Sequence, residues 1–452
     1  MGSAKPNIVL VHWHDTGRYL GAYGLEHVHT PNVDRLAEDG VVFDRSFATA
    51  PLCSPSRGSL FTGRYPHSNG LMGLAHLGWE YHANEHTLPM LLSRHGYRSV
   101  LVGLQHESAD PRTLGFDDVI DLNSDRQAAP AVAELAVDRL ATLAAQDDPF
   151  LMVVGMFEPH RPFPKHRFPT TPDMAVDVPP YLADTEEALD DLRGFSSAVT
   201  YADAATGRIL DQLAALGLDD TTIVVFTTDH GAPFPRAKST LYDAGIETAL
   251  IVRMPTGTAR PSPRSRTLTS HVDVVPTLLE LVGAPVPGNV QGTSFAAELV
   301  DGVDGGDGGG GPRREAVYAE KNWHDLRQYD PIRCVRTERY KYIVSYEDRP
   351  AVPLPGDIAR SGSAIGVDDA APRPPVELYD LEADPFERDN LAGSEALAEV
   401  EKDLAERLET WQRETGDPVL QGPILAARVT PAVRAGRVKR TAVIDPQFVQ
   451  RG

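Results

Sequence analysis

Side chains that can bind metal ions or move protons follow several short apolar segments that we predict to be buried strands. His14 and Asp15 come directly after the first of these segments, and Asp229 and His230 come directly after a later one. Two further predicted strands end in Gly103-Leu104-Gln105-His106 and lead to Glu158-Pro159-His160-Arg161. The carboxyl ends of parallel strands meet at one edge of a sheet, where ligands bind, and a cluster of carboxylates and imidazoles suits a divalent cation. Taken one at a time, such histidines are more often structural, and Asp15 and Asp229 could equally cap helices.

Cys53 places a thiol at the start of a predicted helix, which extends to Leu60. The positive end of the helix dipole would favour an anionic group there, so Cys53 is a candidate nucleophile. The alternative interpretation is a buried and unreactive cysteine, which is the common state of a single thiol.

The elements that must position these residues alternate between strand and helix, which predicts an α/β fold with a mostly parallel sheet flanked by helices. The predicted strands are apolar runs at 7–11, 41–43, 99–102, 150–154, 222–226 and 249–252. The predicted helices are 31–38, 53–60, 88–95, 131–145, 186–216 and 274–282. We expect the long helix to be softly broken near Gly194 and Gly207.

The pattern changes after a glycine cluster at 302–311, which we interpret as a flexible loop or linker. Residues 395–414 have the apolar spacing of an amphipathic helix, and residues 351–375, rich in Pro, Gly and Ala, predict a loop. A small antiparallel sheet is predicted from strands at 316–319, 332–335 and 340–344.

A chain of 452 residues is longer than one hydrophobic core usually supports, so we divide it. The predicted parts are a catalytic α/β domain (1–311), a smaller C-terminal α+β subdomain that carries a helix (312–418), and a tail (419–452).

The composition argues against several classes of protein. A formal net charge of −21 disfavours a nucleic-acid-binding protein, which needs clustered Lys and Arg. The two cysteines, Cys53 and Cys334, are too few for a disulfide scaffold. The sequence contains no run of 18 apolar residues, so we expect no membrane span, and because no leader pattern precedes the first strand we expect a cytoplasmic location.

The segment from Cys53 to Arg64, Cys-Ser-Pro-Ser-Arg-Gly-Ser-Leu-Phe-Thr-Gly-Arg, resembles the signature of the sulfatases in the alkaline phosphatase superfamily. Further matches to that family are Pro6-Asn7-Ile8, the run from Thr30 to Ala37, Thr228-Asp229-His230-Gly231 and Glu377-Leu378-Tyr379-Asp380-Leu381. The resemblance implies an alkaline-phosphatase-like fold, and it implies that Cys53 is oxidised to formylglycine by a formylglycine-generating enzyme. The hydrated aldehyde would then be the nucleophile, activated by a divalent metal.

Carried over by position, the resemblance places the metal on Asp15, Cys53 as formylglycine, Asp229 and His230. Calcium is the usual ion in the family, where the sites begin with paired Asp and end in Asp-Asn. Here His14 and His230 replace oxygen ligands by imidazole, so manganese or zinc becomes a second expectation.

The resemblance also implies roles for residues around the metal. Arg57 would steady the nucleophile, His106 would assist its regeneration, and His160 would protonate the leaving group. Leu104 stands where the family has a lysine, so we expect Lys238 to supply the positive charge. Two more histidines are candidate substrate-binding residues: His14, and His324 from the C-terminal part, for which an exposed surface position is an equal alternative.

Within the family, Gly231-Ala232-Pro233-Phe234-Pro235 and Trp411-Gln412-Arg413-Glu414-Thr415 resemble the heparan N-sulfatases, or sulfamidases. We therefore expect hydrolysis of a sulfate ester or N-sulfate in a small anionic substrate, a sulfated sugar being the first choice. One alternative is a phosphonate monoester or phosphodiester hydrolase, which Asp229-His230 favours. The other is a degenerate binding protein, because Leu104 and His14 depart from the family pattern. The sequence leaves the oligomeric state open.

Overall fold

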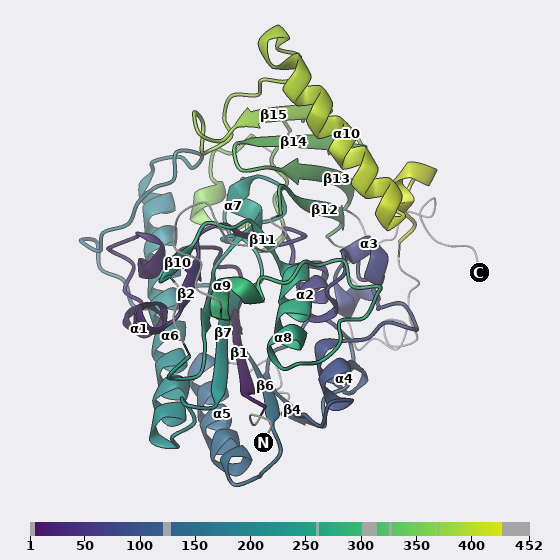
Figure 1. The fold of residues 1–452 in the computed structure, drawn as a ribbon. Helices are drawn as coiled ribbons and strands as arrows, with labels where there is room; N and C mark the ends of the chain where they lie inside the picture. The colour runs from purple at the N-terminus through teal and green to yellow at the C-terminus, as the bar shows by residue number, and fades with distance from the viewer. Residues whose placement is uncertain are drawn as a thin grey trace.

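The strand ends named above come together at one edge of an eight-stranded sheet (Figure 1). The structure is a computed structural model that describes residues 5–120, 128–258, 262–300, 314–324, 328–368 and 370–426. The strand order is β10-β2-β9-β7-β1-β6-β4-β5. The bounds are β1 Asn7–Trp13, β2 Val41–Phe43, β4 Arg98–Gly103, β5 Asp118–Ile120, β6 Phe150–Gly155, β7 Thr222–Thr228, β9 Leu250–Arg253 and β10 Arg264–Ser265.

The sheet is mostly parallel, as predicted. β1 lies between β6 and β7 and is parallel to both, whereas β9 pairs antiparallel with β7 and with β2. The α/β class is therefore confirmed, and the sheet is a mixed one because of β9. The sequence did not predict β10, which has two residues, or β5, whose three residues are all only partly buried.

Helices cover both faces of this sheet because its central strands are apolar on both sides. In β1, Val9, Val11 and Trp13 face one core, and Ile8 and Leu10 face the other. The first core is closed by α1 (Pro31–Asp39), α5 (Ala129–Ala144) and α6 (Glu186–Ala215). The second is closed by α2 (Cys53–Thr62), α4 (Leu88–Ser93) and α8 (Val274–Leu281).

The expected break in the long helix is wrong, because α6 is continuous through Gly194 and Gly207. The two glycines allow close packing. A Cβ at position 207 would lie 2.3 Å from Oδ1 of Asn32, and one at position 194 would lie 3.0 Å from Cβ of Phe163. Glycine here lets α1 and the neighbouring loop approach the helix.

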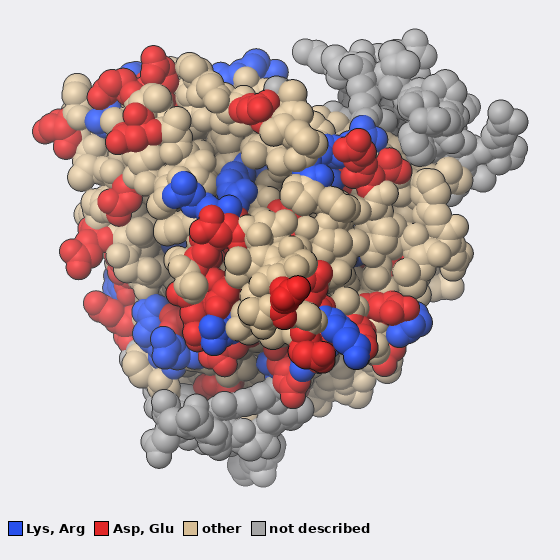
Figure 2. Space-filling view, turned by 90° about the horizontal axis from the view of Figure 1, so that it is seen from above, with Lys and Arg blue, Asp and Glu red and all other residues tan. Residues whose placement is uncertain are grey.

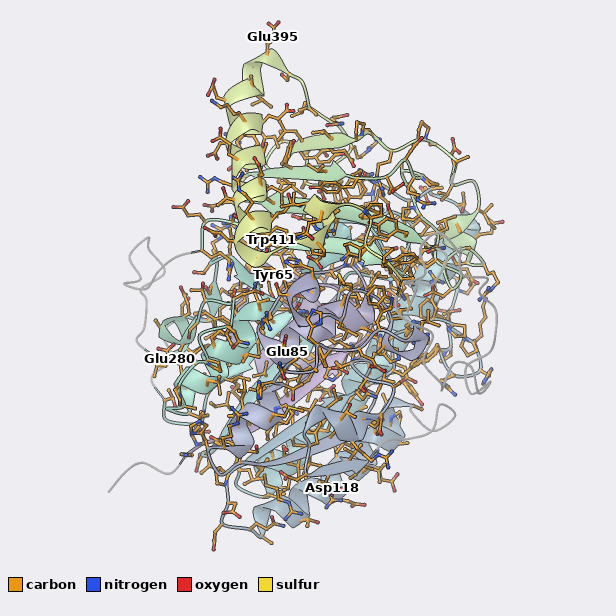
Figure 3. All side chains as sticks on the ribbon, turned by 90° about the vertical axis from the view of Figure 1, so that its right-hand side faces the viewer. Tyr65, Glu85, Asp118, Glu280, Glu395 and Trp411 are labelled. Atoms are coloured by element: carbon orange, nitrogen blue, oxygen red, sulfur yellow. The ribbon has the colours of Figure 1, made fainter. Side chains whose placement is uncertain are left out.

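A second, antiparallel sheet stands above the first in Figure 1, in the order β12-β13-β14-β15. Its strands are β12 Val317–Trp323, β13 Tyr329–Arg336, β14 Tyr340–Ser345 and β15 Val376–Asp380. Helix α10 (Ala398–Thr415) packs on it through Leu404, Leu408 and Trp411. Figure 3 shows Trp411 at the lower end of this helix close to Tyr65, and the two rings are 5.0 Å apart in an edge-to-face arrangement. The helix therefore also contacts the first part of the chain.

Buried contacts hold the second sheet over the carboxyl edge of the first. Phe47 and Ile246 share a core with Val317 and Ile332. A small three-stranded sheet, β11 (Thr269–Ser270), β3 (Ser46–Phe47) and β8 (Glu247–Thr248), lies in this zone. These contacts place segments from beyond residue 320 next to the strand ends of the first sheet.

The predicted division into three parts stays a prediction. The linker at 302–311 and residues 427–452 of the predicted tail lie outside the described residues. In the described part of the chain, no helix is both long and apolar enough to cross a membrane. On the face seen from above, acidic and basic side chains are interspersed (Figure 2).

Candidate active site

The ends of β1 and β7 lie side by side, which joins the two segments that the sequence selected. The backbone N–H groups of Asp15 and His230 both donate to Oδ1 of Asp229, at 2.8 and 2.9 Å. Asp15 has a φ of +46°, a left-handed conformation that Asp adopts more readily than most residues. Gly231 follows, and a Cβ there would lie 1.9 Å from the carbonyl oxygen of Ala244. The turn after β7 therefore requires glycine.

Cys53 lies at the first position of α2 and is only 4% exposed. Its Sγ is 3.4 Å from Nε2 of His230 and 4.0 Å from Oδ1 of Asp15. Burial opposes ionisation of this thiol, but the positive charges of His14 and Lys238 outweigh that effect and lower its pKa to about 7. The thiol is therefore placed in a charged cluster, and not in an apolar core.

Arg57 lies one turn along α2 and is fully buried. Its Nε donates to Oδ2 of Asp229 at 3.1 Å, and its Nη1 donates to Nδ1 of His12 at 2.8 Å. Its Nη2 has no hydrogen-bond partner among the described residues. Arg57 therefore orients Asp229 and retains its Nη2 group for a further acceptor.

His14 faces the carboxylates from β1, with Nδ1 3.1 Å from Oδ2 of Asp229. Burial and the charge of Arg57 oppose protonation of His14, but the negative charges of Asp229 and Cys53 raise its pKa to about 10. A buried histidine between anions holds a proton that a bound cation would replace.

The donor set fits a divalent cation. His14, Asp15, Cys53 and Asp229 each place a ligand atom within 4.8 Å of the others, and all four are buried. His230 adds a further donor. Its Nδ1 is 3.0 Å from the carbonyl oxygen of Gly231, to which it donates, so the lone pair of the neutral ring is on Nε2, 3.0 Å from Oδ1 of Asp15. Two acceptors at this distance need a proton or a cation between them. Burial opposes protonation of His230, but the negative charges of Asp229 and Asp15 outweigh it and raise the pKa of His230 well above its ordinary value.

Lys238 lies beside this set and is 2% exposed. Its Nζ donates to Oδ2 of Asp15 at 2.6 Å and to Oδ2 of Asp357 at 2.9 Å, and it is 3.3 Å from Nε2 of His160. Since Nδ1 of His160 donates to the carbonyl oxygen of Arg161 at 2.6 Å, Nε2 is the atom that accepts from Lys238. Burial lowers the pKa of His160 to about 4, so the proton of this pair is on Lys238.

Two other predicted residues line the same space. The ring of His106 stands edge-to-face against His14 with 4.8 Å between centroids, and burial holds its pKa well below the ordinary value. His324, at the end of β12, has Nδ1 3.3 Å from Oγ of Ser239 and is partly buried, so the exposed alternative is wrong. Leu104 is buried and carries no charge, and Lys238 is the lysine that lies beside the carboxylates.

The sequence did not identify Asp357, which comes from the predicted loop at 351–375 and contacts Lys238. That segment has no periodic pattern and no motif, so only the folded chain shows its place. A second omission is the pair Ser56 and His271. Ser56 donates to the carbonyl oxygen of Asp229, and its Oγ is 2.9 Å from Nδ1 of His271. This pair stabilises the turn after β7 through the backbone of Asp229.

Two family models match this chain. The family model described as Sulfatase matches residues 6–284. A second model, described as N-sulphoglucosamine sulphohydrolase, C-terminal, matches residues 235–354. Human N-sulphoglucosamine sulphohydrolase is 27% identical over 476 residues, which cover 95% of this chain and 94% of that protein.

Solved structures share the fold at lower identity. One, described as a complex with its substrate D-glucosamine-2-N,6-O-disulfate, has a TM-score of 0.70 at 21% identity and covers 93% of this chain and 99% of that one. The phosphonate monoester hydrolase of Agrobacterium radiobacter has a TM-score of 0.69 at 22% identity, covering 91% and 96%. Because both kinds of enzyme have this fold, the fold alone does not separate their substrates.

Proposed function

Since the chain belongs to the sulfatase family, we propose that it hydrolyses the sulfate ester or N-sulfate of a sulfated sugar with a nucleophile formed from Cys53. That the protein is a sulfuric ester hydrolase rests on the family match and on the relative that covers almost the whole chain. The name of that relative, N-sulphoglucosamine sulphohydrolase, supports a sulfated sugar as the substrate class. The observation that carries the proposal is the position of Cys53 at the start of α2, directly against His230 and Asp15.

The chemistry requires position 53 to carry formylglycine, because the geminal diol of a hydrated aldehyde supplies one hydroxyl for attack and another for release of sulfate. A divalent cation on Asp15, Asp229, His230 and residue 53 would draw charge from the sulfate oxygens and lower the pKa of the attacking hydroxyl. Arg57 orients Asp229 for this set, and His14 is either a further donor or a contact to the substrate.

Lys238 is the residue that we assign to the sulfate. Its ammonium group is buried between Asp15 and Asp357, where it can exchange one carboxylate contact for a sulfate oxygen. A buried cation next to developing negative charge stabilises a transition state strongly, because the charges are screened less in a buried site than in water.

The leaving group is assigned to His160. Its Nε2 accepts a hydrogen bond from Lys238 in the free protein, and this nitrogen, once protonated from solvent, would donate the proton to a departing oxygen or nitrogen while Lys238 keeps its charge. His106 lies against His14, and burial lowers its pKa so that it stays neutral. We assign it as the base that assists regeneration of the nucleophile. His324 comes from the second sheet and is assigned to the substrate.

The test combines mass, metal and activity on one sample. Conversion of Cys53 to formylglycine lowers the intact mass by about 18 Da, and the metal content of the same protein identifies the ion. We expect turnover of aryl sulfates and sulfated glucosamine, and none after Cys53→Ser. Cys334→Ser is the matched control, because Cys334 is also a buried free thiol but lies in the core of the second sheet.

Two results would contradict the proposal. Hydrolysis of aryl phosphonates orders of magnitude faster than aryl sulfates would assign the site to the phosphonate alternative. A protein from its native host with an unmodified Cys53, a folded structure and no turnover would support the degenerate alternative.

A further inference from the structure

Two of the sets of metal donors at the site share His14 and Cys53. One consists of His14, Asp15, Cys53 and Asp229, and the other consists of His14, Cys53 and His106. The first is rich in carboxylates. The second, which we call the thiol set, contains one sulfur and two imidazoles and no carboxylate.

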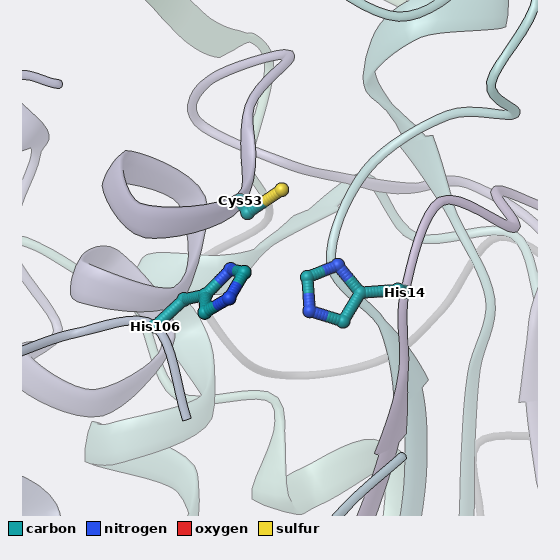
Figure 4. Close-up of side chains that lie close together, drawn as sticks. All are labelled: His14, Cys53 and His106. Atoms are coloured by element: carbon teal, nitrogen blue, oxygen red, sulfur yellow. The ribbon is translucent and has the colours of Figure 1, made fainter. Parts of the chain in front are cut away.

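The geometry of the thiol set is that of a three-ligand site. The three side chains each place a ligand atom within 4.8 Å of the others. They come from different elements: His14 follows β1, Cys53 begins α2 and His106 follows β4. Figure 4 shows the thiol and the two rings around one common space. Because the three elements are fixed by the core, the donors are positioned before any ligand arrives.

Unused nitrogen atoms point to a ligand in this space. His14 is fully buried, yet its Nε2 has no hydrogen-bond partner among the described residues. Nδ1 of His106 is likewise buried without a hydrogen-bond partner in the described part of the chain. The carboxylates differ: Asp15 is paired with Lys238, and Asp229 accepts from Arg57 and from two backbone N–H groups. Buried polar atoms normally have hydrogen-bond partners. Among these metal donors, the imidazole nitrogens are the atoms that lack one.

We propose that the unmodified form of the protein binds zinc through Cys53, His14 and His106. A thiolate and two imidazoles are the ligands that zinc prefers, and three protein ligands leave a fourth position for water. Binding replaces the S–H bond of Cys53 and one N–H bond of protonated His14 by bonds to zinc and releases both protons to solvent, so no atom is oxidised or reduced. The proposal goes beyond the hydrolase function, which uses residue 53 only after its sulfur has been lost.

The proposal implies that zinc binding and maturation exclude each other. A sulfur atom bound to zinc is unavailable to an oxidising enzyme or to an alkylating reagent. Once residue 53 is formylglycine, the thiol set has lost its soft donor, and His14 and His106 alone do not make the same site. Excess zinc would therefore hold the protein in its unmodified form.

The experiment uses the full chain expressed without a maturing enzyme, with the thiol confirmed by intact mass. After removal of metals, the protein is titrated with Co²⁺ and then with Zn²⁺. We expect one Co²⁺ per chain with a sulfur-to-cobalt charge-transfer absorption, and displacement of that ion by Zn²⁺. Zinc should also protect Cys53 from iodoacetamide, as read by peptide mass.

Matched variants locate the site. Cys53→Ser removes the charge-transfer band, whereas Cys334→Ser, at the other buried thiol, leaves it intact. His106→Gln weakens zinc binding by at least about tenfold. His76→Gln leaves zinc binding unchanged, since His76 is exposed and its ring is 6.1 Å from that of His106. Thermal unfolding of each variant shows that it is folded.

Absence of the sulfur-to-cobalt band in the wild-type protein would overturn the proposal. The proposal would also be overturned if His106→Gln left both the absorption band and the zinc affinity unchanged. The sulfur would then bind the metal together with Asp15 and Asp229 and without His106. Neither result affects the hydrolase proposal, which is decided on protein that carries formylglycine.

Discussion

Replacing Lys238 by Met tests the central assignment of the site. The ammonium group contacts Asp15 at 2.6 Å, Asp357 at 2.9 Å and His160 at 3.3 Å, and Met keeps the length of the side chain while removing the charge. Loss of one buried donor that meets developing charge costs about 2.7–4 kcal/mol, or about 10²–10³ in kcat. We expect kcat to fall by that factor on an aryl sulfate.

The same change has a second, measurable effect on stability. Without Lys238 the buried Asp15 has lost its nearest cation, and breaking such a pair costs about 3–5 kcal/mol. A divalent cation bound to Asp15 would compensate, so the loss in thermal stability should be large in chelator and small with metal. Lys165→Met is the control, because Lys165 is 67% exposed and forms only a surface pair with Asp190.

The reasoning fails if the folded, metal-loaded Lys238→Met protein keeps kcat within about threefold, which is under 1 kcal/mol. A rise in KM at constant kcat would also refute it, since Lys238 would then bind substrate and transition state equally.

Three further changes have expected outcomes. Gly231→Ala should give little folded protein by circular dichroism, because its Cβ would lie 1.9 Å from the carbonyl oxygen of Ala244; a normal melting curve would contradict this. Asp357→Asn should lower KM for an anionic substrate by up to roughly fivefold, about 1 kcal/mol, and a higher KM would instead make Asp357 a substrate ligand. Burial opposes ionisation of Asp417, but hydrogen bonds from Arg333 lower its pKa to about 2. The pair therefore stabilises the fold above about pH 4, and this stabilisation is lost as the pH falls towards 2. Asp417→Asn should therefore lower the free energy of unfolding by about 3 kcal/mol at pH 7, and urea denaturation should show the difference from wild type shrinking in acid; a constant difference would contradict the pKa assignment.

The sequence predicted the central sheet and its helices because their signals are local. Ile8 to Val11 form an apolar run that His12, His14 and Asp15 follow closely, and such a run has one stable place in an α/β protein. The local rule failed in α6, where the preference of Gly207 for turns is outweighed by packing against Asn32. Tertiary contact decided that position, and a single sequence does not show it.

The candidate site was predicted to the extent that its residues stand next to strand ends or in a motif. Asp15, Cys53 and Asp229 meet because β1 and β7 are neighbours and α2 begins at their edge. Asp357 could not be predicted, because its approach to Lys238 depends on how the second sheet packs on the first. The direction of the Lys238–His160 hydrogen bond was equally hidden, since it depends on a carbonyl oxygen next to His160.

Cys53 is only 4% exposed, and this burial limits when during synthesis and folding an enzyme could reach its side chain. The proposed conversion of Cys53 requires an enzyme to reach the thiol, and in the folded chain the thiol is buried against His230 and Asp15. His230 follows Cys53 by 177 residues, so the proposed conversion would belong to the interval between emergence of α2 and folding of the segment around His230. Faster folding of that segment would shorten the interval, so a more rapidly folding variant would yield less converted protein.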